Sequence, residues 1–391
     1  DPDYPILQVV EYFRDGAIIQ RGQPIPVWGH ANVGETVTVN LDGATQSVKP
    51  NKYQQWSVTF PAREASVKPI TLTVESTHGF QRTVRDILVG DVWDLTGSTQ
   101  LTSEWAYNQR DQDAELPAAM PLVREFKRRT NADRFATPRK RQFETGRGKY
   151  RSYWATADFS REGQGVTMFA YAFAKTLGRE GVPQGFMTMS AGRGGSSPAF
   201  ASPLSWTSFA GVKDLDNPAF EDRLNELFLQ YPGTDVARQS VTIHLQDVRA
   251  FVQQITQLDK QGADPATFPL KAPSFPEAGK GDVPIDAVPT YAYNWMVSPH
   301  TPMAVAGVLW IPAEYNIGYA PENYAAEMEI YAKSLTNTYG QDEVQFIYAQ
   351  PAGSLVEGVT APEIPDAKIV TFDQWPKSLK DIAVEMAELA E

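Results

Sequence analysis

Residues 87–97 read ILVGDVWDLTG, and the character of the chain changes within this stretch. Residues 91–97 resemble a buried strand in length and pattern. Before it, short strand-like runs alternate with turn residues. After it, strand-like runs alternate with helical ones. The stretch therefore predicts the end of an N-terminal β domain at residue 90 and the start of an α/β domain at residue 91.

Residues 1–90 predict a small β-sandwich. Asp42-Gly43 separates two of its strand-like runs and is a strong hairpin signal. Several short strands without any helical period are typical of a sandwich. The expected strands cover residues 6–13, 25–30, 36–41, 56–60, 70–75 and 83–89.

Residues 91–391 predict a three-layer α/β/α domain with a parallel sheet, because strand-like and helical segments alternate. Ligands bind beyond the carboxyl ends of the strands in such sheets. Residues 265–288, rich in Pro, Gly and Ala, predict a long surface connection. Further strands are expected at 185–190, 304–310 and 344–349, and helices at 166–177, 220–229, 240–258, 322–336 and 376–390.

Composition excludes several classes of function. The 391 residues carry a formal net charge of −12, which argues against a general nucleic-acid binder. The chain has no cysteine, which excludes disulfides, thiolate metal sites and a cysteine nucleophile. Its four histidines and its Asp and Glu residues form no cluster with metal-ligand spacing, so neither a metal nor another cofactor is expected.

The sequence also bears on location. No apolar run approaches the roughly 18 residues that a membrane span needs, so no span is expected. The chain begins at Asp1 rather than Met, which fits removal of a signal peptide as well as trimming. We expect a secreted, periplasmic or cell-surface protein of bacterial origin.

An ordered set of short motifs runs along most of the chain. It comprises AIIQRG at 17–22, IPVWG at 25–29, WSV at 56–58, ILVGDVW at 87–93, FATPRK at 135–140, GG at 194–195, YNWM at 293–296 and GVLW at 307–310. In order and spacing this set resembles the sialate O-acetylesterase family, a branch of the SGNH (GDSL-type) hydrolases. The resemblance implies an SGNH-type fold and a carbohydrate ester as the ancestral substrate.

The same resemblance identifies the positions of the family's catalytic residues. Thr99 stands where the nucleophilic serine belongs, and Gly195 matches the oxyanion-hole glycine. Glu314 is kept from a Gln-Gly-Glu block whose other residues are lost. In the last block Asp373 is kept, and Trp375 replaces the histidine.

These replacements matter for the chemistry. An SGNH esterase needs a hydroxyl nucleophile, an imidazole base and an oriented carboxylate. Indole N–H is only a donor, so Trp375 cannot act as the base. A hydrolase would have to recruit His244 or His300. Otherwise His244 is expected in partly buried helix packing and His300 in a surface loop.

Two further features have two interpretations each. Trp375 either fills the volume of the lost imidazole or stacks on a sugar ring beside Glu314 and Asp373. The segment 124–151, rich in Lys and Arg, is either a solvated strand and loop or a surface that meets an anionic glycan or an acidic partner.

Three functional hypotheses follow. The first is a non-catalytic esterase homologue that serves as a carbohydrate-binding or structural protein of the cell envelope, with a glycan ligand or a homo-oligomeric assembly as partner. The second is a carbohydrate O-acetylesterase that uses Thr99 and a recruited base. Metal-dependent chemistry, the third, has no supporting ligand cluster.

Overall fold

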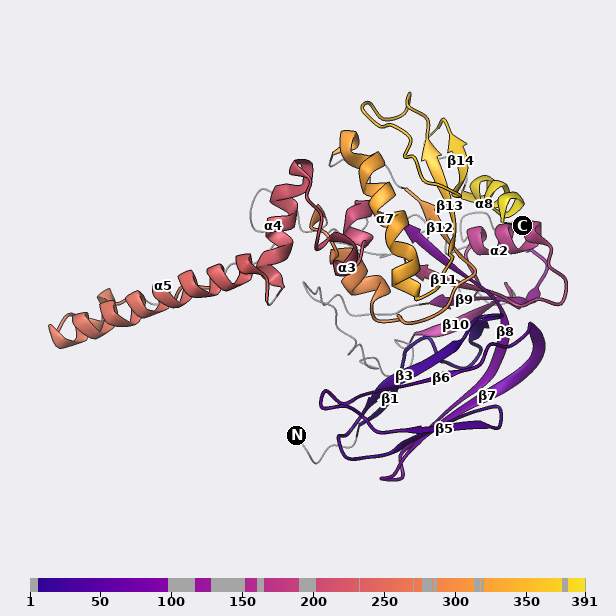
Figure 1. Cartoon of the computed structure of the whole chain (residues 1–391), viewed down its shortest axis with the longest axis horizontal. Helices are drawn as coiled ribbons and strands as arrows, with labels where there is room; N and C mark the ends of the chain where they lie inside the picture. The colour runs from indigo at the N-terminus through magenta and orange to yellow at the C-terminus, as the bar shows by residue number, and fades with distance from the viewer. Residues whose placement is uncertain are drawn as a thin grey trace.

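The structure is a computed structural model. It describes residues 6–97, 117–127, 152–159, 165–189, 202–231, 233–269, 271–275, 283, 287–312, 317, 320–374 and 379–390. Figure 1 shows a β-rich N-terminal region packed below an α/β region, and helix α5 (Asp235–Lys260) pointing away from both.

Strand β8 (Gln81–Gly97) belongs to both regions. Its first half pairs antiparallel with β7 (Ser66–Ser76) and parallel with β2 (Ile18–Gln20). Its second half lies between β11 (Gln184–Met189) and β12 (Gly307–Ile311), parallel to both. The predicted domain boundary therefore falls inside one continuous strand, and the division into two domains stays a prediction.

The N-terminal region consists mostly of antiparallel strands, with β2 parallel to β8. Asp42 and Gly43, at φ 52° and 90°, form the two-residue turn between β4 and β5, as a type I′ hairpin requires. The hairpin prediction is confirmed. The first predicted strand is shorter than expected, because turns follow β1 at residue 11. The remaining strands are β1 (Leu7–Val9), β3 (Ile25–Ala31), β4 (Val37–Leu41), β5 (Ala44–Val48) and β6 (Gln55–Phe60).

The sheet of the α/β region is mixed rather than parallel. Within the described residues its strand order is β10-β9-β11-β8-β12-β13-β14. Edge strand β10 runs antiparallel to β9, which corrects the prediction of a parallel sheet; antiparallel edge strands on parallel sheets are common. The strands not yet given are β9 (Met120–Lys127), β10 (Tyr153–Ala157), β13 (Gln345–Pro351) and β14 (Lys368–Phe372).

Helices cover both faces of this sheet, which confirms an α/β fold. Helices α2 (Met168–Leu177) and α8 (Leu379–Leu389) pack on one face against buried side chains that include Trp93. Helix α7 (Tyr324–Tyr339) packs on the opposite face against residues such as Trp310. Alternate residues of each central strand enter one core or the other, as the two-residue period of a strand requires.

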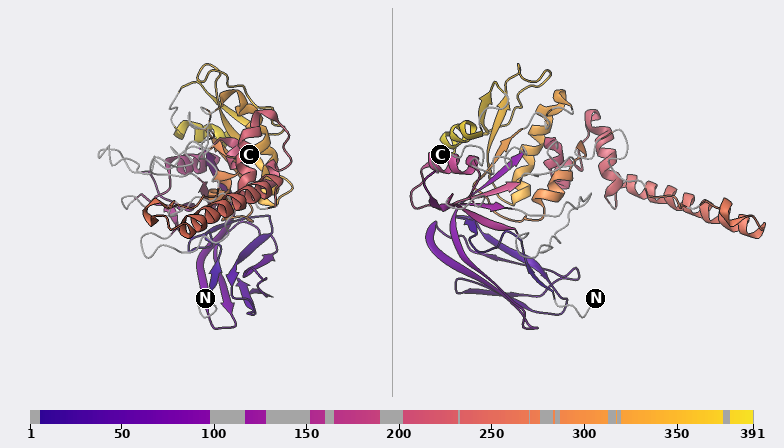
Figure 2. Two further views of the ribbon diagram at one scale, coloured as in Figure 1. Left: turned by 90° about the vertical axis from the view of Figure 1, so that its left-hand side faces the viewer. Right: turned by 180° about the vertical axis from the view of Figure 1, so that it is seen from behind.

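The remaining helical elements lie beside α7 and beyond it. Among the described helices, none is both long and apolar enough to cross a membrane. Helix α5 leaves the body at the end of α4 (Figures 1 and 2). The elements are α3 (Phe209–Val212), α4 (Glu221–Gln230), the 3-10 turns Pro203–Trp206, Pro218–Phe220, Pro265–Thr267 and Pro321–Asn323, and the π-helical turn Tyr293–Val297.

Asp91 ties the two regions together in the middle of β8. Its buried carboxylate accepts hydrogen bonds from Arg21 of the N-terminal region, at 2.7 Å, and from Arg179 after α2, at 2.6 Å. Arg179 also donates to the carbonyl of Ala390 beyond the last helix, at 2.8 Å. One carboxylate thus fixes three distant parts of the chain, and charge-assisted pairs of this kind are the stronger hydrogen bonds.

Gly90 allows a close approach that no other residue permits. A Cβ placed there would lie 2.0 Å from the carbonyl oxygen of Pro183, the residue that precedes β11. The Asp91 amide donates to that same oxygen, at 2.9 Å. The absence of a side chain at residue 90 is therefore a condition for β11 to pair with β8.

We expect Gly90→Ala to lower the free energy of unfolding by about 1–3 kcal/mol, the usual cost of overpacking. The matched control is Gly353→Ala, because a Cβ there would meet nothing closer than 3.9 Å. Urea unfolding followed by circular dichroism measures both. Equal stability of the two variants would show that the contact at Pro183 relaxes without cost.

Candidate ligand site at the carboxyl edge of the sheet

The predicted site residues are unevenly covered by the structure. Thr99, Gly195, Glu314 and Trp375 lie outside the described residues. Asp373 is described: it is exposed and directly follows β14. The geometry that follows concerns the strand ends from which these segments begin.

Three neighbouring strands end at the same edge. Gly97, the last residue of β8, pairs with Ile311, the last residue of β12. Thr96 pairs with Met189, the last residue of β11. The segments that contain Thr99, Gly195 and Glu314 in the sequence therefore all start at adjacent strand ends.

The end of β8 is shaped by glycine. Gly97 has φ +118°, and a Cβ there would lie 2.4 Å from the carbonyl oxygen of Ile311. Only glycine combines this dihedral angle with so close a backbone contact. The strand can therefore turn away from the sheet immediately next to β12.

Asp373 reaches the same edge from the far side. It follows Phe372, which pairs with Pro351 at the end of β13. Strand β14 is three positions from β8 in the sheet, a separation of about 14 Å at about 4.8 Å per strand. Asp373 thus borders the edge without lying next to the end of β8.

A buried acid lies within β8, three residues before the end of the strand, on the face that α7 covers. The Asp94 carboxylate accepts hydrogen bonds from the Thr96 hydroxyl, at 2.6 Å, and from the Tyr339 hydroxyl. Burial raises the pKa of Asp94 to about 6, and the two hydroxyl bonds only partly oppose this shift. An acid with this pKa changes its charge close to neutral pH.

A buried ion pair lies on the opposite face, under the ends of β9 and β11. Glu125 accepts hydrogen bonds from Lys127 and from the Thr188 hydroxyl. It also accepts one at 2.6 Å from the amide of Thr167, the residue that caps α2. Burial lowers the pKa of Lys127, and the neighbouring Glu125 carboxylate opposes that shift. The cluster joins two strand ends to the start of α2.

The described part of the basic segment 124–151 is buried rather than solvated. Arg124 donates at 2.9 Å to the carbonyl of Gly16 and at 2.8 Å to that of Asp86, and it is 8% exposed. Lys127 is 4% exposed. Both interpretations from the sequence are therefore wrong for these two residues, because folding supplies their partners from the N-terminal region and from the strand itself. Residues 128–151 lie outside the described part of the chain.

Asp94, Glu125 and Lys127 were not predicted from the sequence as buried polar residues of the sheet. A signal for Asp94 was present, since a carboxylate inside the buried run 91–97 must find partners. Glu125 and Lys127 gave no such signal, because alternating charges resemble a solvated surface.

All four histidines belong to the described residues. His30 lies in β3, and His78 contacts Glu35 at 2.7 Å in the same N-terminal region. His244 lies on α5, half-buried, with its ring 5.5 Å from that of Phe275, as the prediction of partly buried helix packing required.

His300 does not lie on the surface, and that prediction is wrong. It is 0% exposed, and its ring lies 5.5 Å from the ring of Phe126, the penultimate residue of β9. The chain between the π-helical turn and β12 folds under the sheet, which buries the imidazole. His300 is therefore the one histidine whose ring packs on a strand of the α/β sheet, β9 next to its edge.

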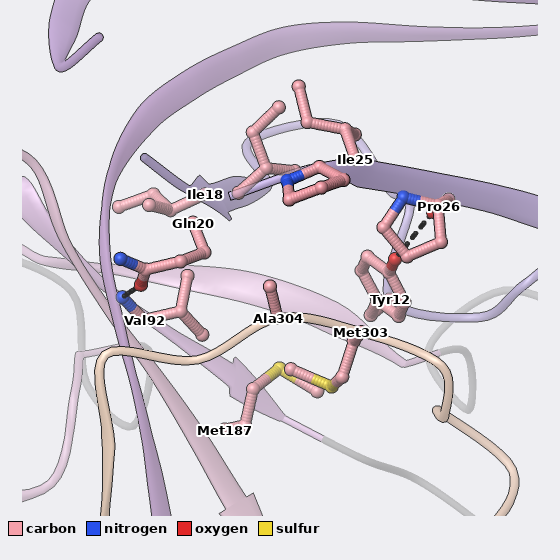
Figure 3. Close-up of a pocket in the computed structure, with 11 residues that line it drawn as sticks. Tyr12, Ile18, Gln20, Ile25, Pro26, Val92, Met187, Met303 and Ala304 are labelled. Carbon is pink, nitrogen blue, oxygen red and sulfur yellow. Dashed lines mark hydrogen bonds between the residues drawn. The ribbon is translucent and has the colours of Figure 1, made fainter. Parts of the chain in front are cut away.

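Two hollows lie away from this edge. The cavity in Figure 3, between the N-terminal region and Met303, has a volume of about 20 Å³, which suits a water molecule rather than a sugar. A groove of about 1090 Å³ opens at the amino ends of the strands, beside Arg21, Asp91 and Arg179. Among the described residues, no group of three His, Asp or Glu is placed to hold a metal ion.

Comparison with solved structures gives an informative match. No protein-family model matches this chain, and no curated protein matches it. The crystal structure of a carbohydrate acetylesterase from Xanthomonas citri is similar, with a TM-score of 0.64 and 22% sequence identity. The match covers 99% of this chain and 74% of that one. The two proteins therefore share a fold.

Two other matches are too distant to indicate a common fold. A calcium-binding mutant of β-glucuronidase 2 from Bacteroides uniformis has a TM-score of 0.17, 15% identity and coverage of 23% of this chain and 12% of that one. A cycloisomaltooligosaccharide glucanotransferase from Paenibacillus has a TM-score of 0.19 and 11% identity, with coverage of 90% and 46% respectively.

We expect Asp94→Asn to gain stability relative to the wild type as the pH rises. The folded wild type holds a proton on Asp94 up to about pH 6, against an ordinary value of 3.8. Stability present below about pH 4 is therefore lost as the pH passes through 6, by about 3 kcal/mol. Urea unfolding of both proteins at pH 4 and pH 7 measures the difference. A difference that is the same at both pH values would contradict the assignment.

Proposed function

We propose that this protein is a non-catalytic relative of the carbohydrate acetylesterases that binds a glycan at the carboxyl edge of its sheet. The fold shared with the Xanthomonas citri enzyme over 99% of the chain supports the relationship to carbohydrate esterases. The SGNH assignment and the degenerate site are parts of the proposal that come from the sequence motifs. The glycan would be met outside the cytosol, in the cell envelope or beyond it.

The positions of the histidines are the observation that carries this proposal. Ester hydrolysis by a hydroxyl nucleophile needs a base beside it. His30 and His78 belong to the N-terminal region, and His244 lies on the projecting helix. The motif position of the catalytic histidine holds Trp375. An esterase of this fold would thus have to rely on a fully buried imidazole.

A binding role would use a carboxylate and an aromatic side chain at the carboxyl edge of the sheet. The exposed Asp373 carboxylate can accept hydrogen bonds from sugar hydroxyls. Trp375, two residues later in the sequence, offers an aromatic face for a sugar ring. Pockets that combine an apolar platform with a few polar groups suit small ligands.

One observation favours the alternative of an active esterase. His300 packs on Phe126 near the end of β9, two strands from β8. In that alternative Thr99 is the nucleophile and His300 is the recruited base.

Hydrolysis decides between the two functions. We expect the wild type to cleave p-nitrophenyl acetate and O-acetylated sialic acid no faster than its Thr99→Ala variant, because none of the four imidazoles is exposed at the carboxyl edge of the sheet. Circular dichroism of both proteins checks the fold. Turnover that disappears in Thr99→Ala and in His300→Gln would overturn the non-catalytic proposal and establish the esterase.

Glycan binding tests the remaining part. We expect acetylated oligosaccharides to bind the wild type and to bind Trp375→Ala about ten-fold more weakly, a loss of about 1.4 kcal/mol. Titration calorimetry measures the affinities. The matched control is Tyr53→Ala, since Tyr53 is an aromatic residue 63% exposed on the N-terminal region. Equal losses in the two variants, or no binding by the wild type, would reject the site.

A further inference from the structure

Helix α5 is a 26-residue arm that exposes apolar side chains. Only Ala237, near its base, is buried, and the helix extends away from the body (Figures 1 and 2). Nine large apolar side chains are exposed among the described residues, and four of them lie on α5. So much exposed apolar surface on one projecting element is typical of an interaction site.

One side of the helix is already partly covered by the chain itself. The half-buried residues follow the alternating spacing of four and three that defines a coiled-coil seam. The ring of His244, at the start of this seam, packs on Phe275 in the segment that returns from the tip of the arm. The half-buried seam consists of His244, Val248, Phe251, Ile255 and Leu258.

A second apolar strip borders this seam and remains open. It comprises Val241, Leu245 and Val252, which are 45%, 47% and 54% exposed. At 100° per residue the three side chains fall within about 40° of one another around the helix. Ile243, which is 50% exposed, points to nearly the opposite side.

The charges at the two ends of the arm match an antiparallel copy of the same helix. Arg238 and Asp259 lie on the side of the open strip, one near each end of α5. Within its own chain Arg238 pairs with Asp235, one turn away, and both side chains are exposed to a partner. With a two-fold axis between Val248 and Arg249, Arg238 faces Asp259 of the second copy, and Leu245 faces Val252 of the second copy.

A parallel pair would lack this match, because identical positions would face each other. Arg238 would then face Arg238 of the second copy, and Asp259 would face Asp259. The charge pattern therefore selects both the partner and its direction.

We propose that α5 is a dimerisation arm and that its partner is α5 of a second copy, packed antiparallel through the strip Val241, Leu245 and Val252. The arm is about 39 Å long at about 1.5 Å per residue. Antiparallel packing lets each tip reach the base of the other arm. The proposal does not depend on whether the protein binds a glycan.

Sedimentation of the full chain tests the strip. We expect the wild type to dimerise at micromolar concentration, and Leu245→Glu or Val252→Glu to raise the dimer dissociation constant at least ten-fold. Ile243→Glu, which adds the same charge on the opposite side of the same helix, should dimerise as the wild type does. A wild type that stays monomeric at about 100 µM would overturn the proposal, as would equal effects of the three variants.

Charge reversal tests the direction. Arg238→Glu should weaken the dimer about five-fold by placing like charges opposite each other, and adding Asp259→Arg should restore it. Because the chain has no cysteine, single cysteines report geometry without interference. A mixture of Leu245→Cys and Val252→Cys proteins should form a disulfide between copies faster than either protein alone. Faster cross-linking of each variant with itself would show parallel packing and overturn the antiparallel arrangement.

Discussion

The single long strand β8 is the constraint on which the rest of the structure depends. Its first half is a member of the N-terminal sheet, and its second half is the centre of the α/β sheet. A continuous strand cannot bend freely without breaking its hydrogen-bond ladder. The two regions are therefore held in one orientation by the backbone itself. Asp91, with its two arginine partners, reinforces that orientation at the point where the ladder changes neighbours.

Much of this fold could be predicted from local signals. The Asp42-Gly43 turn and the helical spacing of α5 depend only on residues close in sequence, and both are present in the structure. Strand β9 could not be found in this way. It reads MPLVREFK, and its charges are satisfied by Asp86 and by the start of α2, which lie far away in the chain. Charged residues enter a strand when folding brings them partners, and sequence patterns do not show those partners.

The candidate site also combines features that the sequence shows locally with features that depend on contacts between distant residues. The motifs predict that Thr99 and Trp375 stand at catalytic positions, and this prediction rests on their place in an ordered set of motifs alone. The buried acid Asp94 could not be found in this way. It and Tyr339 are separated by 245 residues and meet only through the packing of α7 on the sheet. The burial of His300 was missed for a related reason, because a polar residue between two predicted elements resembles a surface loop until the packing is known.

The buried polar groups on both faces of the sheet bear on the proposed loss of hydrolysis, because they would keep the fold rigid even without it. Asp94 lies within β8 on one face, and the Glu125–Lys127 pair lies near the ends of β9 and β11 on the other; both bond to neighbouring elements. Burying such groups is costly unless every partner is held in place. They therefore restrict how the ends of β8, β9 and β11 can move. A binding surface needs this rigidity as much as an active site does, because ordering a flexible surface would reduce affinity. Hydrolysis additionally needs a base, and that is the component which Trp375 does not supply. A rigid edge that lacks a base, as the proposed function has it, would hold a glycan and leave it intact.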